Sequence, residues 1–195
     1  METVRNTPPT AIPNFCQRTR REYQLKSHLI IACICAGLVL VSCNLKAPDS
    51  PSTFRATEFG VSFEMPAGWK MQKVPGLSAP IAHGEARDGF AVNINVVAEP
   101  FAGSVADYAD GNTKALERGG HKILDRASLT TSAGAPVVRI IGESEQGGRK
   151  LRQVFFLLDG RKGNKLVMVC TALAADGTTH DSEFEAAFKT LRVEK

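Results

Sequence analysis

Alternation of hydrophobic and polar positions predicts a series of β-strands that begins at Phe59. In "FGVSFEMP" (59–66) and "FAVNINVVAE" (90–99), apolar side chains occupy every second position. Because successive side chains of a strand point to opposite faces, this period indicates strands with one buried face. Five further strands are expected at 81–86, 121–130, 136–144, 149–159 and 164–173. The connections "QGG" and "GRKG" between the last three are typical of hairpin turns.

Two of these strands contain runs that are apolar at every position, "VFFLL" (154–158) and "LVMVC" (166–170). A strand without a polar face is typical of the middle of a sheet that is covered on both sides. We therefore expect Cys170 to be a buried, unreactive thiol that forms no disulfide. Trp69, which follows the turn at Pro66, is expected to pack into the same domain.

Two segments have helical spacing. In the first, 104–120, Ser104 is a candidate N-cap with Asp107 three residues later, and two glycines end the segment. In the second, 180–193, a capping box is predicted between Ser182 and Glu185. The apolar stripe of this second helix is formed by Phe184, Phe188 and Leu191. Such a stripe indicates packing on a sheet, so the fold class is predicted to be α+β, an antiparallel β-sheet with flanking helices.

A different pattern precedes the strands. A basic cluster leads into "LIIACICAGLVLVS" (29–42), which contains no charged residue. As a helix this run would rise about 21 Å, which is short of a bilayer core of about 30 Å. A basic flank, a short apolar run and small residues are the pattern of a secretory signal peptide, which we assign to residues 1–42. The stretch "TRREYQLK" (19–26) leaves twin-arginine export open beside general secretion.

The apolar run ends in "LVSC" (40–43), which resembles the lipobox of bacterial lipoproteins. In that motif a Leu at −3 and small residues precede the cleavage site, and the Cys at +1 takes up a diacylglycerol as a thioether. The new amine of Cys43 can then be acylated, for example with palmitate, and several acyl chains anchor a protein firmly. We therefore predict lipidation at Cys43; the alternative is an ordinary signal peptide with an incidental cysteine. Three of the other four cysteines, Cys16, Cys33 and Cys35, belong to the leader.

Residues 43–57 are rich in Pro, Ser and polar side chains and are predicted to form a flexible tether. The domain itself is assigned to 58–195. Asn44, at +2, is not the Asp that usually retains lipoproteins at the inner membrane of enteric-type bacteria. If the source has two membranes, the expected location is the outer membrane, facing the periplasm.

The stretch "GVSFEMPAGW" (60–69) and the order of the predicted elements resemble the PsbP-like superfamily over roughly 58–193. This group includes the extrinsic PsbP proteins of photosystem II, a eukaryotic Ran-binding import factor and bacterial DcrB-like lipoproteins. The resemblance implies an antiparallel sheet sandwiched by helices, an α/β/α arrangement, and a binding or assembly role. It implies no shared catalytic residues.

Charge and motifs exclude several functions. The net charge of +4 comes largely from the leader, and the remainder is nearly neutral, so no nucleic-acid partner is expected. His83, His121 and His180 have no His or Cys at ligand spacing, so neither a metal site nor a cofactor is predicted. "GRKGNK" (160–165) is not a phosphate-binding loop. Together with 149–152 it concentrates basic charge on the hairpins, either for an anionic partner or to block sheet-to-sheet association.

The sequence gives little support for an enzymatic function. "GESEQG" (142–147) departs by one residue from the G-x-S-x-G nucleophile elbow, so Ser144 is interpreted as a polar hairpin edge. Asn93 and Asn95 share one strand face, where they either line a ligand pocket or face solvent. The sequence thus favours a non-enzymatic, lipid-anchored envelope protein with a binding or assembly role. It would be attached to the membrane through N-terminal acyl chains and have an envelope protein partner. The alternative is an envelope hydrolase whose site is assembled only in three dimensions.

Overall fold

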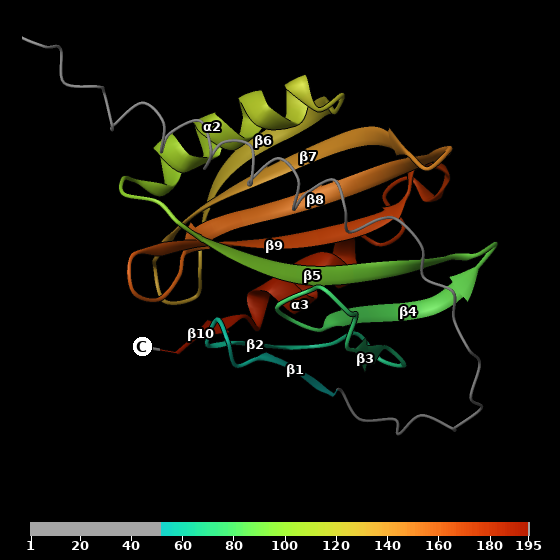
Figure 1. The fold of residues 1–195 in the computed structure, drawn as a ribbon, viewed down its shortest axis with the longest axis horizontal. Coiled ribbons are helices and arrows are strands. Elements are labelled where there is room, and N and C mark those ends of the chain that lie inside the picture. The colour runs from blue at the N-terminus through green and yellow to red at the C-terminus, as the bar shows by residue number, and fades with distance from the viewer. Residues whose placement is uncertain (1–51, 195) are drawn as a thin grey trace, which may run out of the picture. The chain divides into compact units, whose positions relative to one another are not determined.

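The structure, a computed structural model, describes residues 52–194 (Figure 1), so the predicted signal peptide and Cys43 lie outside the described residues. Three short strands form a small antiparallel sheet in the order β1-β2-β10. Their bounds are β1 (Thr53–Ala56), β2 (Val61–Glu64) and β10 (Arg192–Val193). Because Phe54 and Ala56 of β1 are fully buried, the predicted tether is too long at its C-terminal end.

Seven strands form the large sheet, and every neighbouring pair in it is antiparallel. They are β3 (Lys70–Gln72), β4 (Ile81–Arg87), β5 (Phe90–Pro100), β6 (Lys122–Thr130), β7 (Pro136–Gln146), β8 (Arg149–Asp159) and β9 (Asn164–Leu173). Their order is β3-β4-β5-β9-β8-β7-β6. After β5 the chain crosses to the far edge at β6 and returns by hairpins, which brings β9 beside β5.

A tight turn fixes the register of the hairpin between β7 and β8. Gln146 lies opposite Arg149, which leaves the two residues Gly147 and Gly148 as the turn, with φ of 57° and 74°. A two-residue turn that matches the twist of its strands needs positive φ at both positions, which glycine adopts without strain. The predicted hairpin at "QGG" is therefore confirmed.

Two α-helices and one 3₁₀ turn (Ala174–Asp176) complete the described fold. Helix α2 (Val105–Arg118) begins at the predicted N-cap, where the backbone N–H of Asp107 donates to Ser104 Oγ and that of Ser104 to the Asp107 carboxylate. Two hydrogen bonds to the Asp107 carboxylate, the first from the Ser104 hydroxyl at 2.6 Å and the second from the Ser104 backbone N–H, hold the pKa of this carboxyl below its ordinary value.

Helix α3 (Asp181–Lys189) differs from its prediction at both ends. The predicted Ser182–Glu185 capping box is wrong: His180 is the N-cap residue and makes no side-chain cap bond, while Glu185 pairs with Arg139 at 3.0 Å. At the C-terminal end the helix stops at Lys189 because the next residues join the small sheet. There the backbone N–H of Glu64 donates to Thr190 Oγ1, and β10 pairs with β2.

The main core lies between the large sheet, α3 and the small sheet. Aromatic rings stack within it, with Phe156 on Phe188 at 4.2 Å and Phe54 on Phe63 at 4.4 Å between ring centroids. Trp69 is only 8% exposed and meets Phe184 edge-on at 6.5 Å, which confirms its predicted packing. Within the described residues, no helix is long and apolar enough to cross a membrane.

Candidate functional site

The two faces of the large sheet are covered differently. One face packs against α3, where Arg152 makes two hydrogen bonds to the Asp181 carboxylate, the shorter of 2.7 Å. On the other face α2 lies over β6, β7 and β8, and Figure 1 shows no described helix in front of β9, β5 and β4. We call this second face the α2 side. The side chains on both faces of β8 and β9 are buried, which confirms the prediction from their apolar runs.

A row of polar side chains crosses the α2 side of the sheet. Direct register pairs join His83 of β4 to Asn93 of β5, Asn93 to Thr171 of β9, and Thr171 to Gln153 of β8. Directly paired residues of antiparallel strands point to the same face, so the four side chains form one line. The sequence predicted Asn93 as a candidate ligand contact but not the row, because the members of the row are up to 88 residues apart in the chain.

Gln153 is the centre of a buried hydrogen-bond network at the α2 end of this row. Its Oε1 accepts from Ser144 Oγ at 3.2 Å and lies 2.8 Å from His121 Nε2, and its Nε2 donates to Thr171 Oγ1 at 3.5 Å. The other ring nitrogen of His121 lies 3.2 Å from the backbone carbonyl of Leu116 in α2. Ser144 is thus bonded to an amide rather than to the imidazole.

Asn95 stands next to the row, on the same face of β5. It is 3% exposed, and neither its Nδ2 nor its Oδ1 has a hydrogen-bond partner among the described residues. A solvated face, one of the two alternatives for this side chain, does not fit that burial. A buried amide without partners is costly, and such groups mark positions where a further hydrogen-bonding molecule would be stabilising.

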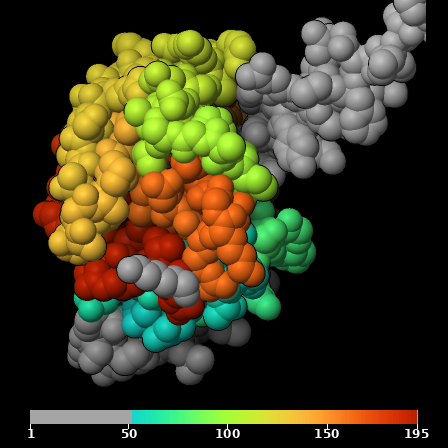
Figure 2. Space-filling model, turned by 90° about the vertical axis from the view of Figure 1, so that its left-hand side faces the viewer, coloured from blue at the N-terminus to red at the C-terminus, as the bar shows by residue number. Residues whose placement is uncertain are grey.

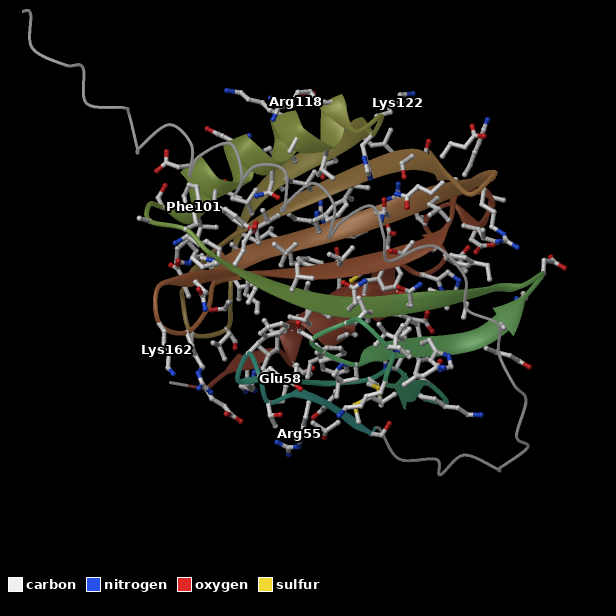
Figure 3. All side chains as sticks on the ribbon, in the orientation of Figure 1. Arg55, Glu58, Phe101, Arg118, Lys122 and Lys162 are labelled. Atoms are coloured by element: carbon white, nitrogen blue, oxygen red, sulfur yellow. The ribbon has the colours of Figure 1, made fainter. Side chains whose placement is uncertain are left out.

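The other end of the α2 side is charged. Glu99, Lys165 and Asp159 are directly opposite one another on β5, β9 and β8. Lys165 Nζ lies 2.9 Å from the Asp159 carboxylate and 5.7 Å from the centroid of the Phe101 ring (labelled in Figure 3). Tyr108 of α2 donates to Glu99, and burial followed by this carboxylate raises the pKa of the phenol. Figure 2 shows the beginning of α2 seated against this end of the sheet.

A concavity of about 360 Å³ lies beside α3. It is lined by Glu64, Met65, Pro66, Ala67, Ser182, Glu183, Ala186, Ala187 and Thr190. Glu183 is paired with His180 at 2.7 Å, and Thr190 is bonded to the backbones of both Glu64 and Ala187. Thr190 therefore links the end of α3 to the small sheet, and Glu183 is engaged at the start of the same helix.

The predicted basic concentration does not form one patch. Arg149 and Lys162 lie at opposite ends of β8, about 37 Å apart for a strand of 11 residues. Lys162 projects from the β8–β9 turn (Figure 3), whereas Arg152 and Lys165 are buried in ion pairs. Within residues 52–194, no group of three or more His, Cys, Asp or Glu is arranged to hold a metal ion.

Cys170 is fully buried, as predicted, and is a free cysteine in the part of the chain that the structure describes. Burial, with a smaller contribution from Asp181, raises the pKa of its thiol well above the ordinary value of 9.0. The thiolate needed for reaction is therefore suppressed.

Comparison with known proteins identifies the fold. No protein-family model and no curated protein matches this sequence. Among solved structures, the chain is similar to cyanobacterial PsbP (CyanoP) from Synechocystis sp. PCC 6803, with a TM-score of 0.55 and 16% identity over 80% of this chain and 99% of that one. It is also similar to LpqN of Mycobacterium tuberculosis, described as involved in cell envelope biogenesis, with a TM-score of 0.54 and 13% identity over 75% and 87% of the two chains. At these identities the likeness establishes the fold alone: residues 52–194 have a PsbP-like α+β fold.

Proposed function

We propose that this protein is a lipoprotein of the bacterial cell envelope, anchored through acyl chains on Cys43, with a domain that binds rather than catalyses. The observation that carries the proposal is "LVSC" (40–43) at the end of an uncharged run and directly before a folded domain. The likeness to LpqN, itself described as involved in cell envelope biogenesis, supports an envelope role.

The position of the domain relative to Cys43 fits an anchored protein. Nine residues (44–52) separate Cys43 from β1. Even fully extended they span at most about 30 Å, since a residue contributes about 3.3–3.6 Å. A domain on this tether would work close to the membrane surface. Asn44 at +2 favours the outer membrane, facing the periplasm, if the source has two membranes.

The arrangement around Ser144 supports a binding role over the hydrolase alternative. A nucleophilic serine needs a neighbouring base that takes its proton, usually a histidine held by a third group. Here Ser144 Oγ donates to the Gln153 carbonyl, which is not basic, and the His121 ring is bonded to that same amide. The described residues thus place an amide where acyl transfer would need an imidazole.

Metabolic labelling with an alkyne-bearing fatty acid tests the anchor. The full chain should incorporate the label, and Cys43→Ser should abolish it and release the protein from membranes. Cys33→Ser and Cys170→Ser are matched controls that should keep the label, because the first lies in the leader and the second is buried. Labelling that persists in Cys43→Ser would overturn the assignment.

A further inference from the structure

Strand β3 displays apolar and basic side chains together at one edge of the large sheet. Its only neighbour in that sheet is β4. We define the β3 surface as Lys70, Met71 and Lys73 with the turn 74–77. The first three residues are all exposed. Met71 is 49% exposed and is one of two exposed large hydrophobic residues in the part of the chain that the structure describes.

The turn after β3 adds apolar surface without adding charge. The backbone N–H of Leu77 donates to the Val74 carbonyl at 3.1 Å, and Gly76 between them has a φ of 84°. With Pro75 at the second position and glycine at the third, these features are those of a type II turn. Pro75 is exposed, and Val74 and Leu77 beside it are half-buried. A turn fixed in this way loses little conformational entropy when it meets a partner.

The charge of the β3 surface is positive. From 65 to 84 the chain contains the two lysines Lys70 and Lys73 and no Asp, Glu or Arg. The exposed carboxylates Glu64 and Glu85 bound this stretch. Neither lysine has an ion-pair partner among the described side chains. Free ammonium groups beside exposed apolar side chains suit a partner that has anionic groups at its surface and hydrocarbon below them.

The predicted tether enters the domain next to the β3 surface. The Ser52 carbonyl accepts a hydrogen bond from the backbone N–H of Met65 at 2.8 Å, so the chain from Cys43 arrives at Met65. A turn follows, in which the N–H of Trp69 donates to the Pro66 carbonyl at 3.1 Å, and β3 begins at the next residue. The ends of such a turn lie within about 7 Å of each other. Figure 1 shows the start of β1 and strand β3 in the same lower part of the domain.

A single exposed apolar side chain is common on protein surfaces and by itself marks no interface. Leu124, the other exposed large hydrophobic residue among those described, lies on β6 at the opposite edge of the sheet. The charged residues that follow it, Asp125 and Arg126, are both held in ion pairs. Met71 differs because its flanking charges are unpaired and because the tether enters beside it.

We infer that the β3 surface docks on the anionic head groups of the membrane that anchors the protein, with Met71 and Pro75 among the head groups and the two lysines on their phosphates. This inference rests on the proposed anchoring at Cys43. A tether of nine residues spans at most about 30 Å and keeps β3 near the lipid, so weak contacts suffice. Anchoring alone leaves the domain free to rotate, whereas docking would turn β6 away from the membrane.

Quenching by lipid-borne nitroxides tests the docking. The mature lipidated protein with Met71→Cys has one reactive thiol, because Cys43 is acylated and Cys170 is buried. A fluorophore is attached to this thiol, and the protein is reconstituted into vesicles of equal parts phosphatidylcholine and phosphatidylglycerol with a nitroxide-bearing lipid. Leu124→Cys is the matched control, because it puts the fluorophore at an exposed apolar position on the opposite edge. Quenching should be several times stronger at position 71 than at position 124.

Charge variants separate head-group docking from apolar contact alone. Lys70→Gln and Lys73→Gln, each combined with Met71→Cys, should lower the ratio of docked to undocked protein about fivefold. Lys114→Gln is the matched control, an exposed lysine of α2, and should leave quenching unchanged. Vesicles of phosphatidylcholine alone should give as little quenching at position 71 as at position 124. Because the substituted residues are exposed, the thermal midpoint should stay constant, which excludes a loss of folding as the cause.

The outcomes distinguish failure of the docking from failure of the anchor. If the protein stays on the vesicles but quenching at position 71 is no stronger than at position 124, the inference is overturned and the anchor is untouched. Equal quenching at position 71 with and without phosphatidylglycerol would overturn the anionic head groups as the partner. A protein that leaves the vesicles on washing would overturn the anchor, and the inference with it, because nothing would then hold β3 near the lipid.

Discussion

Replacement of Trp69 by Ala should destabilise the domain severely. The indole follows the turn at Pro66, where the backbone N–H of Trp69 donates to the Pro66 carbonyl at 3.1 Å. It is 8% exposed and meets the Phe184 ring of α3 at an angle of 89°. It also fills the space above Gly84 of β4, since a Cβ built there would lie 3.4 Å from the indole. One side chain thus joins the start of the large sheet to α3.

The expected cost of Trp69→Ala is about 3–5 kcal/mol, because truncation of a buried aromatic loses its transfer free energy and leaves a cavity. For a domain of this size, 1 kcal/mol shifts the thermal midpoint by about 2–4 °C, so a fall of about 10 °C is expected. Urea unfolding of the full chain, followed by far-UV circular dichroism, measures the change. Trp69→Phe is the matched control and should cost well under half as much, because it keeps an aromatic ring against Phe184.

A loss below about 1 kcal/mol for Trp69→Ala would refute the packing argument, because it is less than the range for core truncations. A fluorescence maximum of the folded wild-type protein equal to that of free tryptophan in water would refute it independently. Either result would mean that the indole does not join the sheet to α3.

Three further predictions concern the helices and the buried thiol. Ser104→Ala should lower the free energy of unfolding in urea by about 1 kcal/mol, because it removes the N-cap of α2. The native pKa of Asp107 is lowered, so its stabilising effect is present above the ordinary value of 3.8 and is lost as the pH falls below that value. Asp107→Asn should therefore reduce the loss of stability at acid pH. Asp181→Ala should destabilise the domain more than the double variant Asp181→Ala/Arg152→Met, since the single change leaves a buried guanidinium without its carboxylate. Calorimetry measures both variants, and equal losses of thermal stability would contradict this. Cys170 should resist a thiol reagent in the native protein and react quickly after denaturation; rapid native labelling would mean that β9 is exposed.

The strands whose bounds the sequence predicted best are those that are buried on both faces. The bounds of both β8 and β9 agree with those predicted from the sequence. Both strands contain runs that are apolar on both faces, so the prediction did not need to decide which face meets solvent. Strand β1 was missed because Thr53–Ala56 follows a Pro- and Ser-rich stretch, and only pairing with β2 buries Phe54. Local propensity is weak for so short a strand, and tertiary contact decides it.

In the candidate site, too, local spacing predicted some residues, whereas others depend on tertiary contacts. Asn93 and Asn95 could be placed on one strand face from their spacing alone, because side chains alternate along a strand. Their neighbours Thr171 and Gln153 could not, because the pairing of β5 with β9 depends on the long return of the chain from the far edge of the sheet. No local pattern encodes that register.

The mass of the mature protein tests the central claim most directly. Intact mass spectrometry of the protein purified from membranes should give a chain that begins at Cys43 and carries a diacylglyceryl group, with or without a further acyl chain on its amine. A mature chain that begins at any other residue, or an unmodified Cys43, would contradict the account.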